Sequence, residues 1–280
     1  MLNGLAFGVL LLVLSSGLAL IFGLRGVVNF AHGALYMLAA YIGLSISQRT
    51  SFWLALVAVP LLLAAAGWAV DRFGLRYLVM RSPLDMVLLS FGVTFVVADV
   101  VQTVWGTQAR TIDPPDLLAG PAHLGFASYP AYRLFVIAVG LLICAGLMAW
   151  LKLSRTGLFV RAAGDDRVTA GAMGVNVDRV SATVVALGFG LAGAAGVLAG
   201  PYLTLSPEMG TDILITTFIV VVVGGLGSIG GPMIAALLIG LANAIAAVHA
   251  PSLAAYVPYA LMLVVLLVRP RGIAGRRTAL

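Results

Sequence analysis

Residues 23–33, with the sequence GLRGVVNFAHG, separate two long apolar runs near the start of the chain. Residues 1–24 and 26–48 carry no formal side-chain charge on either side of Arg25. A membrane crossing needs about 20 predominantly apolar residues to span roughly 30 Å of hydrocarbon, and both runs meet that length. The stretch 23–33 therefore predicts a break between two membrane-spanning segments, with polar side chains placed at or inside the membrane.

The composition agrees with a membrane protein. Hydrophobic residues make up 62% of the chain, charged residues make up 9%, and the mean hydropathy is +1.12. A soluble domain is roughly half apolar and a quarter charged, so this composition excludes an ordinary soluble globular fold. Cys144, the single cysteine, falls within an apolar run, which predicts a structural role and no intramolecular disulfide. We expect the lipid bilayer as surroundings and no nucleic acid as a partner.

Further segments follow from the remaining apolar runs. The tract between Asp212 and Arg269 contains no formal charge and is too long for one crossing, so it must fold back. Two groups of helix breakers divide it, the glycine-rich GGLGSIGGP at 224–232 and Ala250-Pro251-Ser252. The expected spans are 2–22, 32–48, 51–70, 84–104, 133–151, 180–201, 212–223, 232–249 and 253–268. The fold class is therefore all-α: a polytopic transmembrane helical bundle of about eight or nine segments, with residues 1–280 forming one domain.

The basic residues indicate which loops face the cytoplasm. Short loops rich in Lys and Arg stay inside, and this assignment places all but three of the 16 basic residues on one side. The longest inside loop is 152–179. Nine crossings put the N-terminus outside, whereas a re-entrant 212–223 gives eight crossings and an N-terminus inside; charge alone leaves both open. The first segment has no basic region before it, which predicts a retained span rather than a signal peptide.

The inside loop 152–179 combines charges with a small apolar strip. Arg161, Asp165, Asp166 and Arg167 offer a polar surface of a short helix. An apolar strip at roughly helical spacing follows: Val168, Ala172, Met173 and Val175. A solvated connector is one interpretation, and a docking segment is the other. The small residues before Met173 and Gly174 favour docking.

Polar groups within spans are costly and usually face a bundle interior, a cavity or the interface. Asn29 and His32 are therefore candidates for lining or bracing a solute path, with structural hydrogen bonding as the alternative. We expect Arg25 to anchor at the cytoplasmic interface. Asp99, Glu208 and Asp212 fall near external ends of spans, where they either contact an external protein or are solvated.

Three stretches resemble a known family. They are GLALIFGLRGVVNFAHGALYMLAAYIG at 17–43, RAAGDDRVTAGAMGVNVDRVS at 161–181 and VVVGGLGSIGGPMIAALLIGLANA at 221–244. In this order and spacing they resemble the permease subunits of bacterial ABC importers for branched-chain amino acids, and the resemblance covers essentially the whole chain. Family members often carry an acidic residue followed by Ala-Ala in the central loop. This chain departs from that pattern with Arg167-Val168-Thr169-Ala170.

The resemblance implies a multi-pass protein of the bacterial inner (plasma) membrane. It implies two permease subunits around a translocation path, two cytoplasmic ATPase subunits and an external substrate-binding protein. No cofactor is expected to bind the chain directly, and no metal or catalytic residue is expected; ATP would be hydrolysed by the partner subunits. The sequence contains no Walker A motif, which agrees with a transport subunit that is not itself an enzyme.

The candidate site residues fall into two sets. The expected solute path comprises Asn29, His32, Gly33, Gly224, Gly225 and Gly227. The expected ATPase-coupling residues are Arg161, Asp165, Asp166, Arg167, Met173 and Gly174. The substrate is a branched-chain or related amino acid, with an amide or a sugar as alternatives. A secondary transporter without an ATPase is the rival, but it would need charged relay residues within the spans, where Asp99 stands nearly alone.

Overall fold

The computed structural model describes residues 2–75, 82–123 and 128–275. The long helices are α1 (Leu2–Arg25), α2 (Ala31–Arg49), α3 (Phe52–Val70), α5 (Pro83–Trp105), α6 (Ala131–Leu153), α9 (Val177–Ala199), α10 (Met209–Gly224), α11 (Gly230–His249) and α12 (Val257–Val268). The shorter elements are η1 (Asp71–Leu75), η2 (Asp116–Leu118), β1 (Pro121–His123), β2 (Ser128–Pro130), α7 (Arg155–Asp165), α8 (Arg167–Ala172) and η3 (Pro251–Tyr256). The strands β1 and β2 pair as a small antiparallel hairpin.

The helices confirm the expected membrane segments. Within the described residues, seven helices are long and apolar enough to cross a membrane, and α2 and α10 pack against several of them. Every predicted span coincides with a helix whose ends differ by a few residues. The predicted short segment at 212–223 is α10, whose 16 residues extend about 24 Å. It is shorter than the roughly 30 Å of hydrocarbon.

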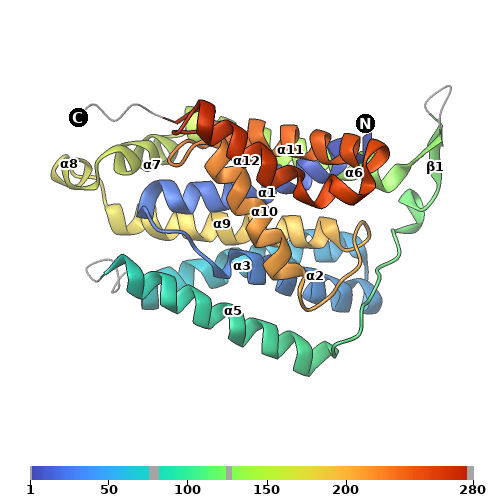
Figure 1. The fold of residues 1–280 in the computed structure, drawn as a ribbon. Helices are drawn as coiled ribbons and strands as arrows, with labels where there is room; N and C mark the ends of the chain where they lie inside the picture. Colours follow the sequence, from blue (N-terminus) through green and yellow to red (C-terminus); the bar gives the residue numbers. More distant parts are fainter. Residues whose placement is uncertain (1, 76–81, 124–127, 276–280) are drawn as a thin grey trace.

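Contacts at the two ends of α1 orient the bundle. At one end, the side chain of Asn3 accepts hydrogen bonds from Tyr129 and Arg133, beside the hairpin. At the other end, Arg25 reaches Ser181 at the start of α9, so α1 and α9 are antiparallel. α1 begins at one end of the molecule and the described segment after α12 lies toward the other (Figure 1), which fits an odd number of crossings.

Basic residues assign the two ends to sides of the membrane. The end that carries α7, α8 and the C-terminal segment holds most of the described Lys and Arg residues, so it is the cytoplasmic end. The hairpin end, with Arg49, Arg110 and Arg133, is the external end. Of the two topologies that charge left open, the structure favours nine segments with the N-terminus outside.

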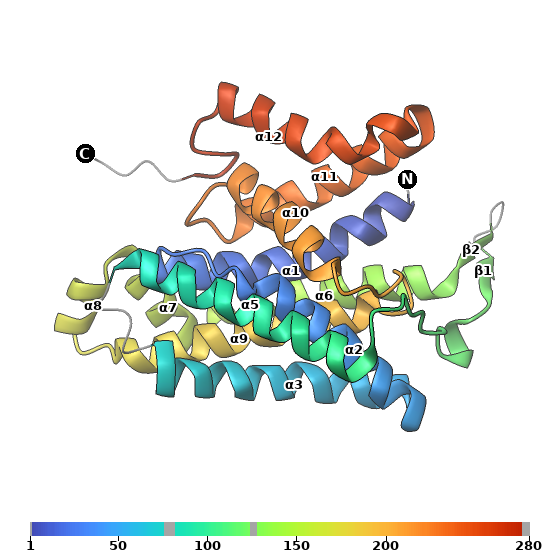
Figure 2. The ribbon, with the colours of Figure 1, turned by 60° about the horizontal axis from the view of Figure 1, so that its bottom comes forward.

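The core is built around α1 and α9, which are buried on most sides. Small residues allow the close contacts, since helices in lipid associate through tight packing. A side chain at Gly240 would overlap the backbone of Gly8, and one at Gly196 would overlap the backbone of α2 near Tyr36. α3 and α12 lie at opposite edges (Figure 2), with the central helices between them.

Candidate functional site

The break between α1 and α2 lies within the bundle. His32, in the first turn of α2, is fully buried, and its Nε2 donates to the carbonyl oxygen of Leu14 at 3.0 Å. Leu14 is midway along α1, so α2 begins beside the middle of α1. Residues 26–30 therefore run back from the end of α1 as non-helical backbone at membrane depth.

Side chains of α5 supply hydrogen bonds to this non-helical segment. Ser90 Oγ accepts from the backbone N–H of Phe30 at 3.2 Å, and Thr94 Oγ1 donates to the carbonyl oxygen of Phe30 at 3.2 Å. Asn29 Oδ1 accepts from the N–H of Ala31, also at 3.2 Å. Irregular backbone at this depth is stable only where protein or water satisfies it. Ser90 and Thr94, which sequence reasoning missed, therefore fix the start of α2.

His32 braces α2 against α1. Gly17 leaves room for the ring, because a Cβ there would lie 3.1 Å from His32 Cε1. Gly33 packs against the start of α10, where an added side chain would overlap the carbonyl oxygen of Gly210. Asn29 borders a largely apolar cavity of about 200 Å³ between α1, α2, α3, α5 and α9. The structure thus gives His32 and Gly33 packing contacts, and their role in the solute path stays a prediction.

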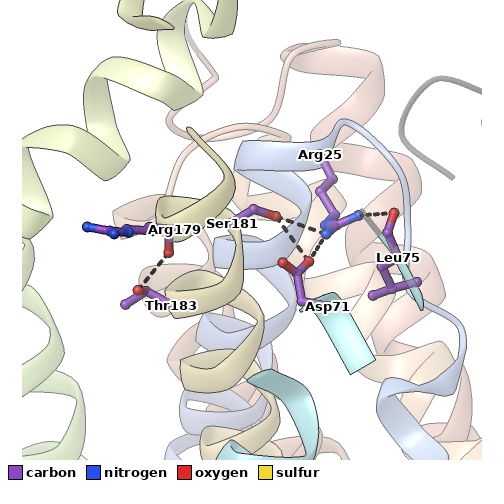
Figure 3. A network of polar contacts seen from close by, with 6 residues as sticks. All are labelled: Arg25, Asp71, Leu75, Arg179, Ser181 and Thr183. Atoms are coloured by element: carbon purple, nitrogen blue, oxygen red, sulfur yellow. Dashed lines mark hydrogen bonds and ion pairs between the residues drawn. The ribbon is translucent and has the colours of Figure 1, made fainter. Parts of the chain in front are cut away.

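Arg25 lies in a buried polar cluster at the cytoplasmic end (Figure 3). Its guanidinium pairs with the carboxylate of Asp71, donates to Ser181 Oγ at 2.9 Å and donates to the carbonyl oxygen of Leu75 at 3.4 Å. Ser181 in turn donates to Asp71 Oδ1 at 3.1 Å. The side chains of Arg25 and Asp71 are each 2% exposed. Arg25 lies at the cytoplasmic end as expected, but its side chain is buried there and joins α1, η1 and α9.

The segment 152–179 has a defined shape held by its own charged residues. Asp166 accepts from the N–H groups of Val168 at 2.9 Å and Thr169 at 3.1 Å, which caps the start of α8. The hydrogen bonds from Thr169 and Val168 hold the pKa of Asp166 below its ordinary value. Arg161 donates to the carbonyl oxygen of Leu151 at the end of α6. Of the predicted coupling residues, Asp166 thus bonds within the segment, and Arg161 ties the segment to the end of α6.

The tip of the segment exposes apolar side chains. Val168 is 83% exposed and Met173 is 82% exposed, at the end of the molecule that faces the cytoplasm. Gly174 follows with φ +88°, a left-handed conformation that favours glycine and turns the chain toward α9. Asp165 borders a cavity, and Arg167 is half-buried. These exposed apolar groups agree with the docking interpretation, which stays a prediction; Val168 and Met173 are called the docking tip below.

The capping role of Asp166 gives a first prediction. Asp166→Ala removes the acceptor for two backbone N–H groups, so we expect the first turn of α8 to fray and its amides to exchange several-fold faster. Asp166→Asn, whose side-chain oxygen can still accept these hydrogen bonds, is the matched control. Its amides should exchange at nearly the rate of the unchanged chain. Hydrogen exchange of the purified protein, read on residues 166–172, measures both. Equal protection in all three proteins would contradict the capping role.

The predicted glycine cluster forms the turn between α10 and α11. Gly225 and Gly227 have φ of +106° and +84°, and a side chain at Gly224 would overlap the backbone of Pro232. The C-terminal segment docks here, since the backbone N–H of Ile273 donates to the carbonyl oxygen of Val223 at 2.8 Å. The turn lies at the cytoplasmic end.

Part of the predicted solute path lies beside the predicted coupling residues, and the rest of the path lies elsewhere in the bundle. Gly227 shares a cavity of about 190 Å³ with Arg161 and Asp165, so the glycine turn lies beside α7. In contrast, Gly224 stands at the far end of α10 from Gly210, against which Gly33 packs, about 21 Å along the helix. The predicted path residues therefore occupy two separate levels of the bundle. Among the described residues, no group of His, Cys, Asp and Glu could hold a metal ion.

Comparisons with known proteins place this geometry in context. A family model described as "Branched-chain amino acid transport system / permease component" matches residues 1–266. The chain is 30% identical to the high-affinity branched-chain amino acid transport system permease protein LivH of Escherichia coli, over 99% of this chain and 94% of LivH. It is also 30% identical to the permease protein BraD of Pseudomonas aeruginosa, over 98% and 94%.

A solved structure supports the fold. The chain resembles PsaBC from Streptococcus pneumoniae, solved in complex with Fab, with a TM-score of 0.53 over 96% of this chain and 91% of that one. The sequence identity there is 14%, so this likeness concerns the fold alone.

Proposed function

Because the chain belongs to the family of permease components of branched-chain amino acid transport systems, we propose that it is the membrane-spanning subunit of an ABC importer for branched-chain or related amino acids. The observation that carries this proposal is the 30% identity to LivH over 99% of the chain. The many-helix bundle of apolar segments agrees with it. The chain is a component of a transport system in the membrane.

The proposed partners follow from the absence of a nucleotide-binding motif in the sequence and from the exposed surfaces at the two ends of the bundle. The sequence contains no G-x-x-x-x-G-K-[S/T] motif, so we assign ATP hydrolysis to separate cytoplasmic subunits. The docking tip, Val168 and Met173, would contact those subunits. A second permease subunit would complete the solute path, and an external binding protein would deliver the amino acid at the hairpin end.

The buried cluster at Arg25 supports a route for mechanical coupling. α9 begins at Val177, within the C-terminal end of the segment 152–179, and its first turns hold Ser181. Ser181 bonds both Arg25 at the end of α1 and Asp71 after α3. A displacement of the docking tip would therefore act on three helices through one set of hydrogen bonds, as alternating access requires.

The experiment is purification from the native host followed by reconstitution. The tagged chain should retain an ATPase subunit and a second permease subunit in mild detergent. In proteoliposomes, binding protein loaded with leucine, isoleucine or valine should raise ATP hydrolysis and drive uptake. A panel with an amide and a sugar tests the alternative substrates. Uptake that needs an ion gradient and no ATP would contradict the proposal and favour a secondary transporter.

A further inference from the structure

The outward faces of the peripheral helices differ in polarity. α3 and α12 carry no charged or amide side chain, and α6 carries charge only in its end turns, at Arg133 and Lys152. Such faces are suited to lipid. α5 is different: it is one of the least buried spans, and three exposed polar side chains, Asp99, Gln102 and Thr103, lie in its last two turns.

One stripe of α5 holds two of these polar residues, Asp99 and Thr103. Gly92, Val96, Asp99 and Thr103 recur at helical spacing, and all four are exposed. At about 100° per residue they share one face. Ser90, Thr94 and Val101, which meet the bundle, fall on the opposite side of the helix wheel, and α2 is the one extensive neighbour of α5 among the described elements. Asp99 therefore points away from the subunit.

The depth of Asp99 makes a lipid-facing position unfavourable. It precedes the end of α5 at Trp105 by six residues, about 9 Å along the axis. α5 is about 35 Å long, so only a few ångströms of it extend beyond the hydrocarbon, and a short aspartate side chain cannot reach the interface. Carboxylates at this depth face a protein interior or a water-filled cavity.

We propose that the face of α5 formed by Gly92, Val96, Asp99 and Thr103 packs beside the second permease subunit and lines the solute route, where the Asp99 carboxylate receives the ammonium group of the amino acid. This inference rests on the proposed function. The charge favours it, because an ammonium group is shared by all amino acid substrates and is absent from a neutral sugar. A Cβ added at Gly92 would meet nothing within 4 Å, which leaves space for a partner to approach. The inner face of α5 holds the start of α2 through Ser90 and Thr94, so α5 stands between this route and the break at 26–30.

The first experiment tests whether the face is aqueous. Cys144 is the single cysteine, so Cys144→Ser gives a background for Asp99→Cys and Thr103→Cys in the full complex in membrane vesicles. Leu263→Cys, 61% exposed on α12, is the lipid-facing control. A cationic thiosulfonate, which reacts with thiols in water, should modify the two α5 positions at least tenfold faster than the control. Equal, slow reaction at all three positions would overturn the proposal.

The second experiment tests recognition of the ammonium group. Asp99→Asn should reduce leucine uptake at least tenfold, mainly through a higher KM, and Asp99→Glu should recover part of it. Asp85→Asn, at the cytoplasmic start of α5, is the matched control and should transport normally. Fast labelling with normal transport by Asp99→Asn would overturn the role of the carboxylate. If the unchanged complex transports no amino acid, the proposed function fails instead, and the labelling contrast still tests the aqueous face.

Discussion

Arg25→Met is expected to lose most of the folded protein, because it leaves the Asp71 carboxylate buried without its counter-charge. The two side chains are each 2% exposed, and removal of one partner of a buried ion pair destabilises a protein by about 3–5 kcal/mol. The yield of monodisperse protein after a heating series in detergent measures the effect. Arg72→Met is the control. Arg72 follows Asp71 in η1 but is exposed, and its guanidinium lies over the Trp68 ring.

A second substitution separates charge from packing. Arg25→Met with Asp71→Leu removes both charges, and replacing a buried pair by apolar groups is often neutral or stabilising. We therefore expect the double variant to recover most of the heat resistance that Arg25→Met loses. It should still transport poorly, since Ser181 no longer links α9 to α1 and η1. No recovery of heat resistance would contradict the importance of the unpaired carboxylate.

The sequence predicted the spans well because charge-free runs of sufficient length admit few other structures in a bilayer. The buried cluster at Arg25 could not be predicted from the sequence, because Arg25 and Asp71 are 46 residues apart and no local pattern connects them. Arg25 was therefore interpreted as an interfacial anchor, the ordinary role of an arginine at the end of a span. Ser90 and Thr94 gave a weak signal, two hydroxyl residues four apart in an apolar helix, but their partner is the backbone of another segment.

The coupling segment shows a different limit of sequence reasoning. Its position, its charges and its short helix were predicted, and the structure contains α7 and α8 there. The pattern did not separate charges that contact a partner from charges that hold the segment together. Arg161 and Asp166 do the latter, whereas Val168 and Met173 remain open to solvent. Which side chains remain exposed depends on how α7 and α8 fold, and the sequence pattern does not give that arrangement.

The exposed side chains of the docking tip allow a direct test of whether this tip couples ATP hydrolysis to uptake. Val168→Glu with Met173→Glu should abolish ATP-driven uptake and reduce co-purification of the ATPase subunit at least tenfold, because two carboxylates would be desolvated in the contact. Truncation of a hot-spot residue in an interface costs about 2 kcal/mol or more. Both side chains are more than four-fifths exposed, so the subunit itself should fold and insert normally.

The controls keep the shape and the polarity of the tip. Val168→Ile with Met173→Leu retains an apolar surface and should keep both the ATPase subunit and uptake. Asp166→Lys with Met173→Glu should also uncouple hydrolysis from uptake, but it removes the cap of α8 as well, so its effect mixes contact with local folding. The pair at Val168 and Met173 isolates the contact. Normal uptake with a full complement of ATPase by the Val168→Glu, Met173→Glu variant would exclude the tip from energy coupling and move the contact elsewhere on the cytoplasmic end.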